Sequence, residues 1–215
     1  MTKLVREILD KANAVLVDVT KQRWPYAELQ GYLDSAQIAI CARRPDASTA
    51  LITHDCTQSA RQVLADPALR LIKVESNSSS KLAITAIDVD VLDEQIPDWR
   101  YASTPASDVQ HYTYDDRDPK AFHVYPVVST NHQIELVASV MPPQLSEDNW
   151  ISGTVEIAVD ETYEPALLDY VLHRAFQKDA DNPSYSARST VHLQSFLEYV
   201  GGKTQSDASV SPNNG

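Results

Sequence analysis

Two runs of carboxylates and six histidines are the residues of this chain whose types and spacing could do chemistry. Asp115, Asp116 and Asp118 are spaced like part of a calcium-binding loop, which would also need a central glycine and a distal glutamate. Both are missing, and Pro119 directly after Asp118 favours a plain turn. A metal-dependent hydrolase that uses Asp115, Asp118 and a histidine therefore remains only an alternative.

The second acidic run, residues 88–94, could be interpreted as paired carboxylates for acid–base catalysis. Carboxylates at the start of a helix are better explained by capping and by the helix dipole, so we expect Asp88 to cap a short helix that Pro97 ends. No GxSxG pattern marks a nucleophilic serine. We therefore predict no catalytic residue and no enzyme.

The histidines and cysteines favour structural roles. No HExxH pattern occurs, and no histidine has the spacing to a cysteine that a zinc site needs. His192 falls on the apolar face of a helix and is expected to be a core histidine, whereas His173 is expected to form a surface ion pair with Asp169. Cys41 and Cys56 are predicted to be free thiols in a reducing compartment. We expect no metal ion.

Composition excludes several functions. The 215 residues include only five glycines against twelve prolines, and neither GxGxxG nor a P-loop pattern occurs, so no nucleotide cofactor is expected. A formal charge of −12 disfavours a nucleic-acid reader, because affinity for phosphates comes mainly from Lys and Arg. No apolar run approaches the length of a membrane span, and no signal peptide is recognised, which predicts synthesis in the cytoplasm and no membrane partner.

The longest helical pattern in the second half of the chain runs over residues 163–179. Six apolar residues share one face there: Leu167, Leu168, Val171, Leu172, Ala175 and Phe176. Asn182-Pro183 interrupts the pattern, and a further helix is expected from Ser184 until Gly201-Gly202 ends it. The two helices should form a hairpin whose apolar face needs a partner.

A second helical hairpin is predicted at the N-terminus. Apolar residues keep helical spacing from Leu4 to Leu16, including Val15, and Pro25 suits the start of a helix that Pro45 stops. The aromatic cluster Trp24-Pro25-Tyr26 lies at that start. It is expected to staple the hairpin closed; the alternative is an exposed anchor, which makes Trp24 and Tyr26 candidate assembly contacts.

The middle of the chain has the texture of short strands. Six segments are β-prone: residues 50–53, 69–75, 82–87, 111–114, 122–127 and 133–140. Residues 61–64 could be helix or strand. The pattern predicts an α+β fold in which N- and C-terminal helical hairpins form a bundle and carry an inserted small, mostly antiparallel β unit. The expected boundaries are 1–48, 49–150 and 151–202, followed by an extended tail at 203–215.

Several short phrases occur in an order and spacing typical of one protein family. They are Arg23-Trp24, Glu28-Leu29, Asp34 to Gln37 and Pro45; Leu92-Asp93 and Pro97 to Trp99; His111 to Asp115, Pro119, Phe122, Tyr125-Pro126, Ile134-Glu135 and Pro142-Pro143; and Leu167, Asp169 to Leu172, Arg174-Ala175, Lys178 to Ala180, His192 and Phe196. Over residues 4–200 this series resembles the adaptor, or head-to-tail connector, proteins of tailed bacteriophages, chiefly short-tailed ones. One departure is Pro25, where a Ser or Asp cap would be expected.

The resemblance implies a structural virion protein without a cofactor. Such adaptors form a ring, typically of twelve copies, beneath the portal protein, and carry the tail tube or nozzle, with tail fibre proteins as possible neighbours. Genomic DNA passes through the lumen without sequence-specific binding. The acidic excess of the chain is expected to be turned partly towards that lumen, since a surface that repels a polyanion lets DNA slide.

The segment 203–215 lies outside the resemblance. It has little to bury, and we expect it to become ordered by docking on the portal or on an adjacent subunit, with Val210 and Pro212 as anchors. Three alternatives to the adaptor remain. They are another neck or tail component such as a tail tube or stopper protein, the hydrolase considered above, and a small-molecule binding module built on the β unit.

Overall fold

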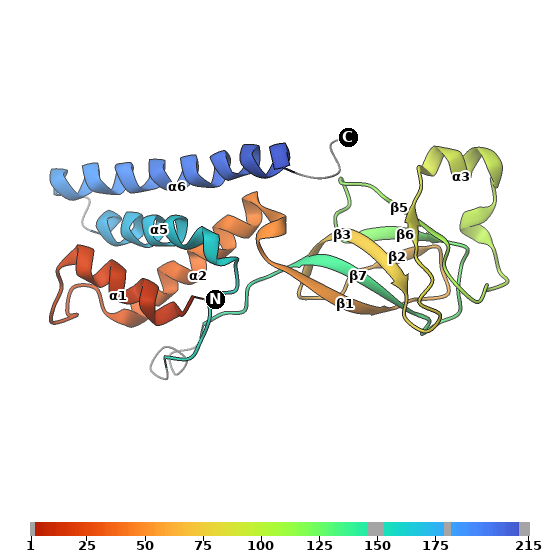
Figure 1. Ribbon diagram of the computed structural model, residues 1–215, viewed down its shortest axis with the longest axis horizontal. Helices are drawn as coiled ribbons and strands as arrows, with labels where there is room; N and C mark the ends of the chain where they lie inside the picture. Colours follow the sequence, from red (N-terminus) through yellow and green to blue (C-terminus); the bar gives the residue numbers. More distant parts are fainter. Residues whose placement is uncertain (1–2, 146–152, 179–181, 211–215) are drawn as a thin grey trace. The chain divides into compact units, whose positions relative to one another are not determined.

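The computed structural model describes residues 3–145, 153–178 and 182–210, with residues 203–210 described by their backbone only. The chain forms two compact units (Figure 1). One is a helical unit made of Met1–Ser48 and Pro142–Gly215, and the other is a β unit made of Thr49–Met141. The predicted α+β fold is confirmed, because helices from both ends of the chain pack together and two small sheets are inserted between them.

The helical unit contains four α-helices and two short 3-10 helices within its described residues. In chain order they are α1 (Val5–Leu16), α2 (Tyr26–Arg43), η1 (Pro45–Ala47), η3 (Glu161–Tyr163), α5 (Glu164–Gln177) and α6 (Pro183–Val210). Helix α5 packs against α1, α2 and α6, and Figure 1 shows it lying between α6 and the other two. The helix predicted over residues 163–179 is therefore the centre of this unit.

Helix α5 forms where the sequence predicts it because its apolar residues follow the helical period. Leu167, Val171, Ala175 and Phe176 are almost completely buried, and each of the larger ones contributes about 1.5–3 kcal/mol on burial. Leu168, predicted on the same face, is only partly buried. Pro165 lies in the first turn, where its missing N–H costs no hydrogen bond.

Helices α1 and α2 supply the apolar surface that covers α5. Ile8 and Leu9 of α1, with Leu33 and Ile40 of α2, are fully buried in the shared core. Val15 was predicted on the buried face of the first helix but is 45 % exposed. It lies in the last turn of α1, where the helix reaches the end of the bundle.

Helix α2 also has a polar stripe that holds the returning chain. The Gln30 side chain donates to the Leu145 carbonyl oxygen at 2.6 Å, and the Leu145 N–H donates to the Asp34 carboxylate at 3.2 Å. One turn further on, the Ala158 N–H donates to the Gln37 side-chain oxygen at 2.7 Å. These side chains therefore fix the segments by which the chain re-enters the helical unit.

Helix α6 corrects one prediction. It was expected to end at Gly201-Gly202, but its backbone remains helical through both glycines to Val210. Glycine lowers helix propensity by about 1 kcal/mol and does not forbid a helix, so a helix already formed up to Val200 can continue through both residues. The prediction of an extended tail from residue 203 is therefore wrong for residues 203–210.

The β unit contains two sheets (Figure 1). Strands β1 (Thr49–Asp55), β7 (Gln133–Val140) and β3 (Ala68–Asn77) form one sheet in the order β1-β7-β3, and all its pairs are antiparallel. Its first strand pairs with its last, Thr49 opposite Ser139, so the unit begins and ends at adjacent points.

The second sheet has the order β2-β6-β5-β4, from β2 (Arg61–Val63), β6 (Ala121–Tyr125), β5 (His111–Tyr114) and β4 (Thr85–Ala86). Only its β4–β5 pair is parallel. The ambiguous segment 61–64 is thus a strand. Helices α3 (Val89–Gln95) and η2 (Trp99–Tyr101) follow β4, and Asp88 caps α3 as predicted by accepting the Asp90 N–H. Phe122, Ile134 and Leu136 are fully buried between the strands.

Candidate functional site

The aromatic cluster at the start of α2 is divided between core and surface. Trp24 is only 2 % exposed. Its indole N–H donates to the Ala175 carbonyl oxygen at 2.9 Å, and its ring meets those of Phe176 and Tyr185 edge-on. The side chain is thus buried and joins the start of α2 to α5 and α6, whereas the predicted staple was to close the hairpin of the first two helices.

Tyr26 is half-buried against its own chain. Its hydroxyl donates to the Asp10 carboxylate, and the Lys21 ammonium lies 4.2 Å from its ring centre. Burial, followed by the hydrogen bond to Asp10, raises the pKa of Tyr26 to about 12. The phenol is therefore neutral at physiological pH. A role in assembly remains a prediction for Tyr26 and for Val210, the last residue of α6; Pro212 lies outside the described residues.

The predicted ion pair between His173 and Asp169 is wrong. His192 Nδ1 lies 2.8 Å from Asp169 Oδ1, so this carboxylate pairs across to α6 instead of along α5. His173 Nδ1 lies 3.0 Å from the Ser189 carbonyl oxygen and 2.9 Å from the Ser189 hydroxyl. Both histidines connect α5 to α6. Asp169 and His173 therefore bond to side chains of the facing helix and not to each other one turn apart on α5.

The remaining histidines also have structural partners. Each lies against one neighbouring side chain: His111 on Thr85, His132 on Asn77, His54 on the Phe122 ring and His123 on the Trp99 ring. Burial lowers the pKa of His54 and of His123. These six side chains are spread over both units of the chain, each in a separate packing or hydrogen-bonding role.

The carboxylates of the turn after β5 form ion pairs with arginines. Asp116 accepts from Arg70 at 2.5 Å and Asp118 accepts from Arg61 at 2.9 Å. Both pairs tie the turn to neighbouring strands. Within residues 3–145, 153–178 and 182–210, no group of three or more His, Cys, Asp or Glu side chains is placed to hold a metal ion.

The other candidate groups are likewise engaged. Asp93 accepts from the Arg100 guanidinium and from the Trp99 indole N–H, the latter at 2.8 Å, and these hydrogen bonds lower the pKa of its carboxyl, Arg100 most. Both cysteines are free and buried; burial raises the thiol pKa to about 11 for Cys41 and about 12 for Cys56. Such thiols stay protonated and are poor nucleophiles.

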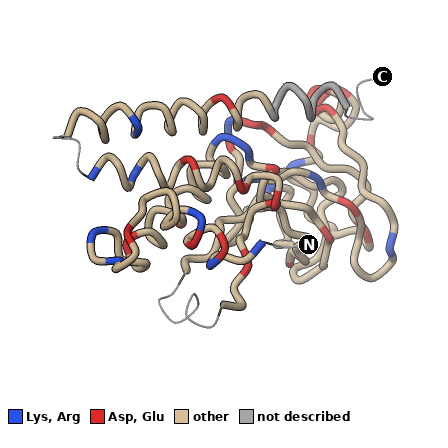
Figure 2. The backbone as a smooth tube through the Cα atoms, turned by 60° about the vertical axis from the view of Figure 1, so that its left-hand side comes forward, with Lys and Arg blue, Asp and Glu red and all other residues tan. Residues whose placement is uncertain are grey.

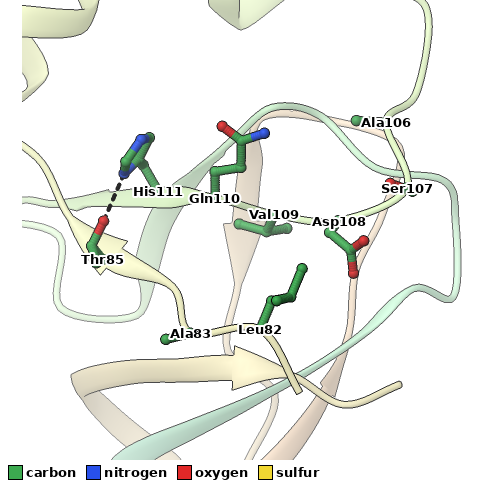
Figure 3. Close-up of a pocket in the computed structure, with 9 residues that line it drawn as sticks. All are labelled: Leu82, Ala83, Thr85, Ala106, Ser107, Asp108, Val109, Gln110 and His111. Atoms are coloured by element: carbon green, nitrogen blue, oxygen red, sulfur yellow. Dashed lines mark hydrogen bonds between the residues drawn. The ribbon is translucent and has the colours of Figure 1, made fainter. Parts of the chain in front are cut away.

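The β unit has a recess that the sequence did not predict (Figure 3). It has a volume of about 500 Å³ and lies where β4 and the chain before β5 separate. Val109 is buried at its floor and Leu82 stands exposed beside it, while Asp108 and Gln110 carry its polar groups. His111 and Thr85, joined at 2.7 Å, close one end.

The connection between α1 and α2 is the second surface that the sequence did not reveal. Val17 is 78 % and Val19 is 85 % exposed there. Val17 caps α1 in the left-handed conformation, with φ of 56°. For a β-branched residue this conformation costs about 1–2 kcal/mol, and glycine is the usual residue there. Two valines in an otherwise polar loop are the sequence feature that could have indicated this surface.

Comparison with known proteins identifies the family. No helix of the described residues is long and apolar enough to cross a membrane. No curated protein matches the chain at a significant level. The sequence profile of the family described as SU10 adaptor protein, by contrast, matches residues 3–215. That match covers nearly the whole chain, both units included, and confirms the resemblance, so this protein belongs to the SU10 adaptor protein family of bacteriophage adaptors.

Proposed function

We propose that this protein is a structural head-to-tail adaptor that forms a ring of twelve copies between the portal and the tail tube or nozzle of a phage particle. The observation that carries this proposal is the family match over residues 3–215. The ring, its twelve copies and its neighbours, including any tail fibre proteins, come from the resemblance of the chain to head-to-tail connectors.

The contacts within the protomer support a structural role over a catalytic one. Histidines, carboxylates and thiols that could have done chemistry are engaged in caps, ion pairs and packing, as at Asp88, Asp118 and His192. A ring instead closes through heterologous contacts, in which one face of a copy meets a different face of the next. Adaptor function therefore requires unlike surface patches and no converging reactive groups.

Passage of DNA through the ring fits the charge of the chain. The net charge of −12 disfavours binding of a polyanion, and Figure 2 shows acidic residues along the chain. We propose that part of this acidic excess lines the lumen, where DNA must slide without binding. A channel lined by lysine and arginine would contradict this element of the proposal.

The end of the chain is proposed to reach a neighbour. The backbone of α6 continues to Val210, and the residues that follow include Pro212. We propose that the segment 203–215 docks on the portal or on an adjacent copy. Deletion of residues 203–215 should then weaken attachment to DNA-filled heads, and unchanged attachment would remove this part of the proposal.

The whole function can be tested by mass. Purified protein is mixed with portal rings from the same phage, and the complex is examined by light scattering and by electron microscopy of negatively stained particles. Twelve copies of 23.9 kDa should add about 290 kDa to the portal as a second, coaxial ring. A chain that leaves the portal unchanged at micromolar concentration, and is absent from purified virions, would refute the adaptor function.

A further inference from the structure

The exposed valines of the α1–α2 connection form a defined surface, here called the valine loop (residues 17–23). Val17 and Val19 point apolar side chains into solvent at 78 % and 85 % exposure. Single exposed apolar residues are ordinary, but two on one short loop form a small apolar knob. The loop also places Val17 in a left-handed conformation that glycine would adopt more easily. The loop therefore combines exposed apolar side chains with a backbone conformation that is unfavourable for valine.

The valine loop is held in one shape. The Asp18 carboxylate accepts the backbone N–H groups of Arg23 and Trp24, both at 2.9 Å, and the Thr20 hydroxyl at 3.3 Å. These hydrogen bonds lower the pKa of Asp18, so the carboxylate that organises the loop stays ionised. A loop fixed in advance loses little conformational entropy when it docks. The knob is thus preorganised for contact.

The flanks of the knob are cationic. Lys21 is exposed and also has a left-handed backbone, with φ of 54°, and Arg23 follows two residues later. Because Asp18 directs its carboxylate at the backbone of the loop, the charge that a partner meets is positive. The complementary surface is an apolar hollow with a carboxylate at its rim.

The recess of the β unit in Figure 3 has this chemistry. Leu82 supplies exposed apolar surface, Asp108 supplies a carboxylate that also accepts from the Ser80 hydroxyl, and none of the described side chains that line it is a lysine or arginine. A second recess of about 440 Å³ on the same unit is lined by Asp88, Asp115 and Arg100, and Arg100 also pairs with Asp93. Charge does not separate the two recesses, but exposed apolar surface favours the first, because Leu82 is 58 % exposed.

We propose that the valine loop of one copy inserts into this recess on the β unit of the adjacent copy. Val17 and Val19 contact the exposed Leu82, and the Lys21 ammonium, which lies over the Tyr26 ring within its own copy, pairs with the Asp108 carboxylate. The contact joins two unlike patches, which is the kind of contact that closes a ring. The inference rests on the proposed ring and adds to it the surfaces that mate.

Cysteine cross-linking tests the contact directly. The double variant Val19→Cys with Ser107→Cys places one thiol on the knob and one on the exposed rim of the recess. Mild oxidation should link successive copies into a ladder of dimers, trimers and larger species on a denaturing gel. The native Cys41 and Cys56 are buried and contribute little background. Each single variant should stop at dimers.

A matched control uses another exposed valine. Val191 on α6 is 61 % exposed, so Val191→Cys with Ser107→Cys presents thiols of similar accessibility without the knob. It should give no ladder. Charge reversal provides a second readout: Lys21→Glu in the cross-linking variant should reduce ladder formation about tenfold, and adding Asp108→Lys should restore it, since the pair is then reversed.

Both experiments are run on concentrated protein alone and on protein bound to portal rings. A ladder in either setting that follows the charge reversal supports the contact. Multiple copies on the portal without a ladder would overturn the contact while leaving the adaptor function intact. A ladder in solution from protein that never binds the portal would support the contact and contradict the adaptor function. No ladder in both settings, or one that the Val191 control matches, refutes the inference.

Discussion

Gln37 offers the sharpest test of how the helical unit is closed. Its side chain is fully buried on α2, and its oxygen accepts the Ala158 N–H at 2.7 Å. On either side of Ala158, the side chains of Ile157 and Val159 are buried in the core at 5 % and 4 % exposure. This hydrogen bond, together with the one from the Ile157 N–H to the Lys3 carbonyl oxygen at 3.0 Å, fixes the register in which these two apolar side chains enter the core.

The substitution Gln37→Leu keeps the volume and removes the acceptor. The net loss of the hydrogen bond is about 1 kcal/mol, and leaving the Ala158 N–H without a partner adds about 1–3 kcal/mol. The Gln37 amide nitrogen has no hydrogen-bond partner of its own, so its removal offsets part of this cost. We therefore expect a loss of about 2 kcal/mol in the free energy of unfolding, and a fall in Tm of about 4–8 °C.

Circular dichroism at 222 nm during urea and thermal unfolding measures this change, because the signal comes mainly from the helical unit. Gln177→Leu is the matched control: Gln177 is exposed on α5, and its replacement should change stability by no more than about 0.5 kcal/mol. If Gln37→Leu unfolds with the same midpoint as Gln177→Leu, the assignment of Gln37 as the latch for residues 157–159 is refuted.

Three further predictions use other parts of the helical unit. Gly201→Ala should stabilise α6 by about 0.5–1 kcal/mol in the same assay, because open space surrounds the new methyl group, whereas Gly153→Ala should destabilise since Gly153 has a φ of +67°. Trp24→Phe should cost about 1–3 kcal/mol in urea unfolding by leaving the Ala175 carbonyl oxygen unpaired; a neutral result would contradict this bond. Ion pairs with two lysines hold the pKa of Glu164 below its usual value, so its stabilisation is present above the unfolded pKa of about 4.3 and is lost as pH falls through the lower folded pKa. Glu164→Gln should therefore be less stable than the native chain at pH 7 and equal to it near pH 2–3 in unfolding curves measured across this range.

Helices with a strong apolar period were predictable from the sequence. Residues 164–177 carry their buried face at helical spacing, and Asp88 marks the start of α3 by its side-chain chemistry. The end of α6 was not predictable in the same way. Glycine penalties are small and local, and both glycines are exposed with open space around them, so α6 continues through them by propagation from the packed helix before them.

The surfaces proposed for assembly were harder to predict from the sequence. Exposure of Val17 and Val19 depends on how the loop turns, which Asp18 decides by hydrogen bonds to residues five and six positions away. The recess beside Asp108 arises where two segments far apart in the sequence separate, a property of pairing between strands. Trp24 illustrates the converse, since an aromatic residue at a helix start has the same local pattern whether it is buried or exposed.

The pairing of Thr49 with Ser139 has a consequence for how such a protein can diversify. Because the β unit departs from the bundle and rejoins it at neighbouring points, it can be lengthened, replaced or removed while the helices keep their connections. Selection for attachment to different tails can then change the β unit while the helical unit stays the same.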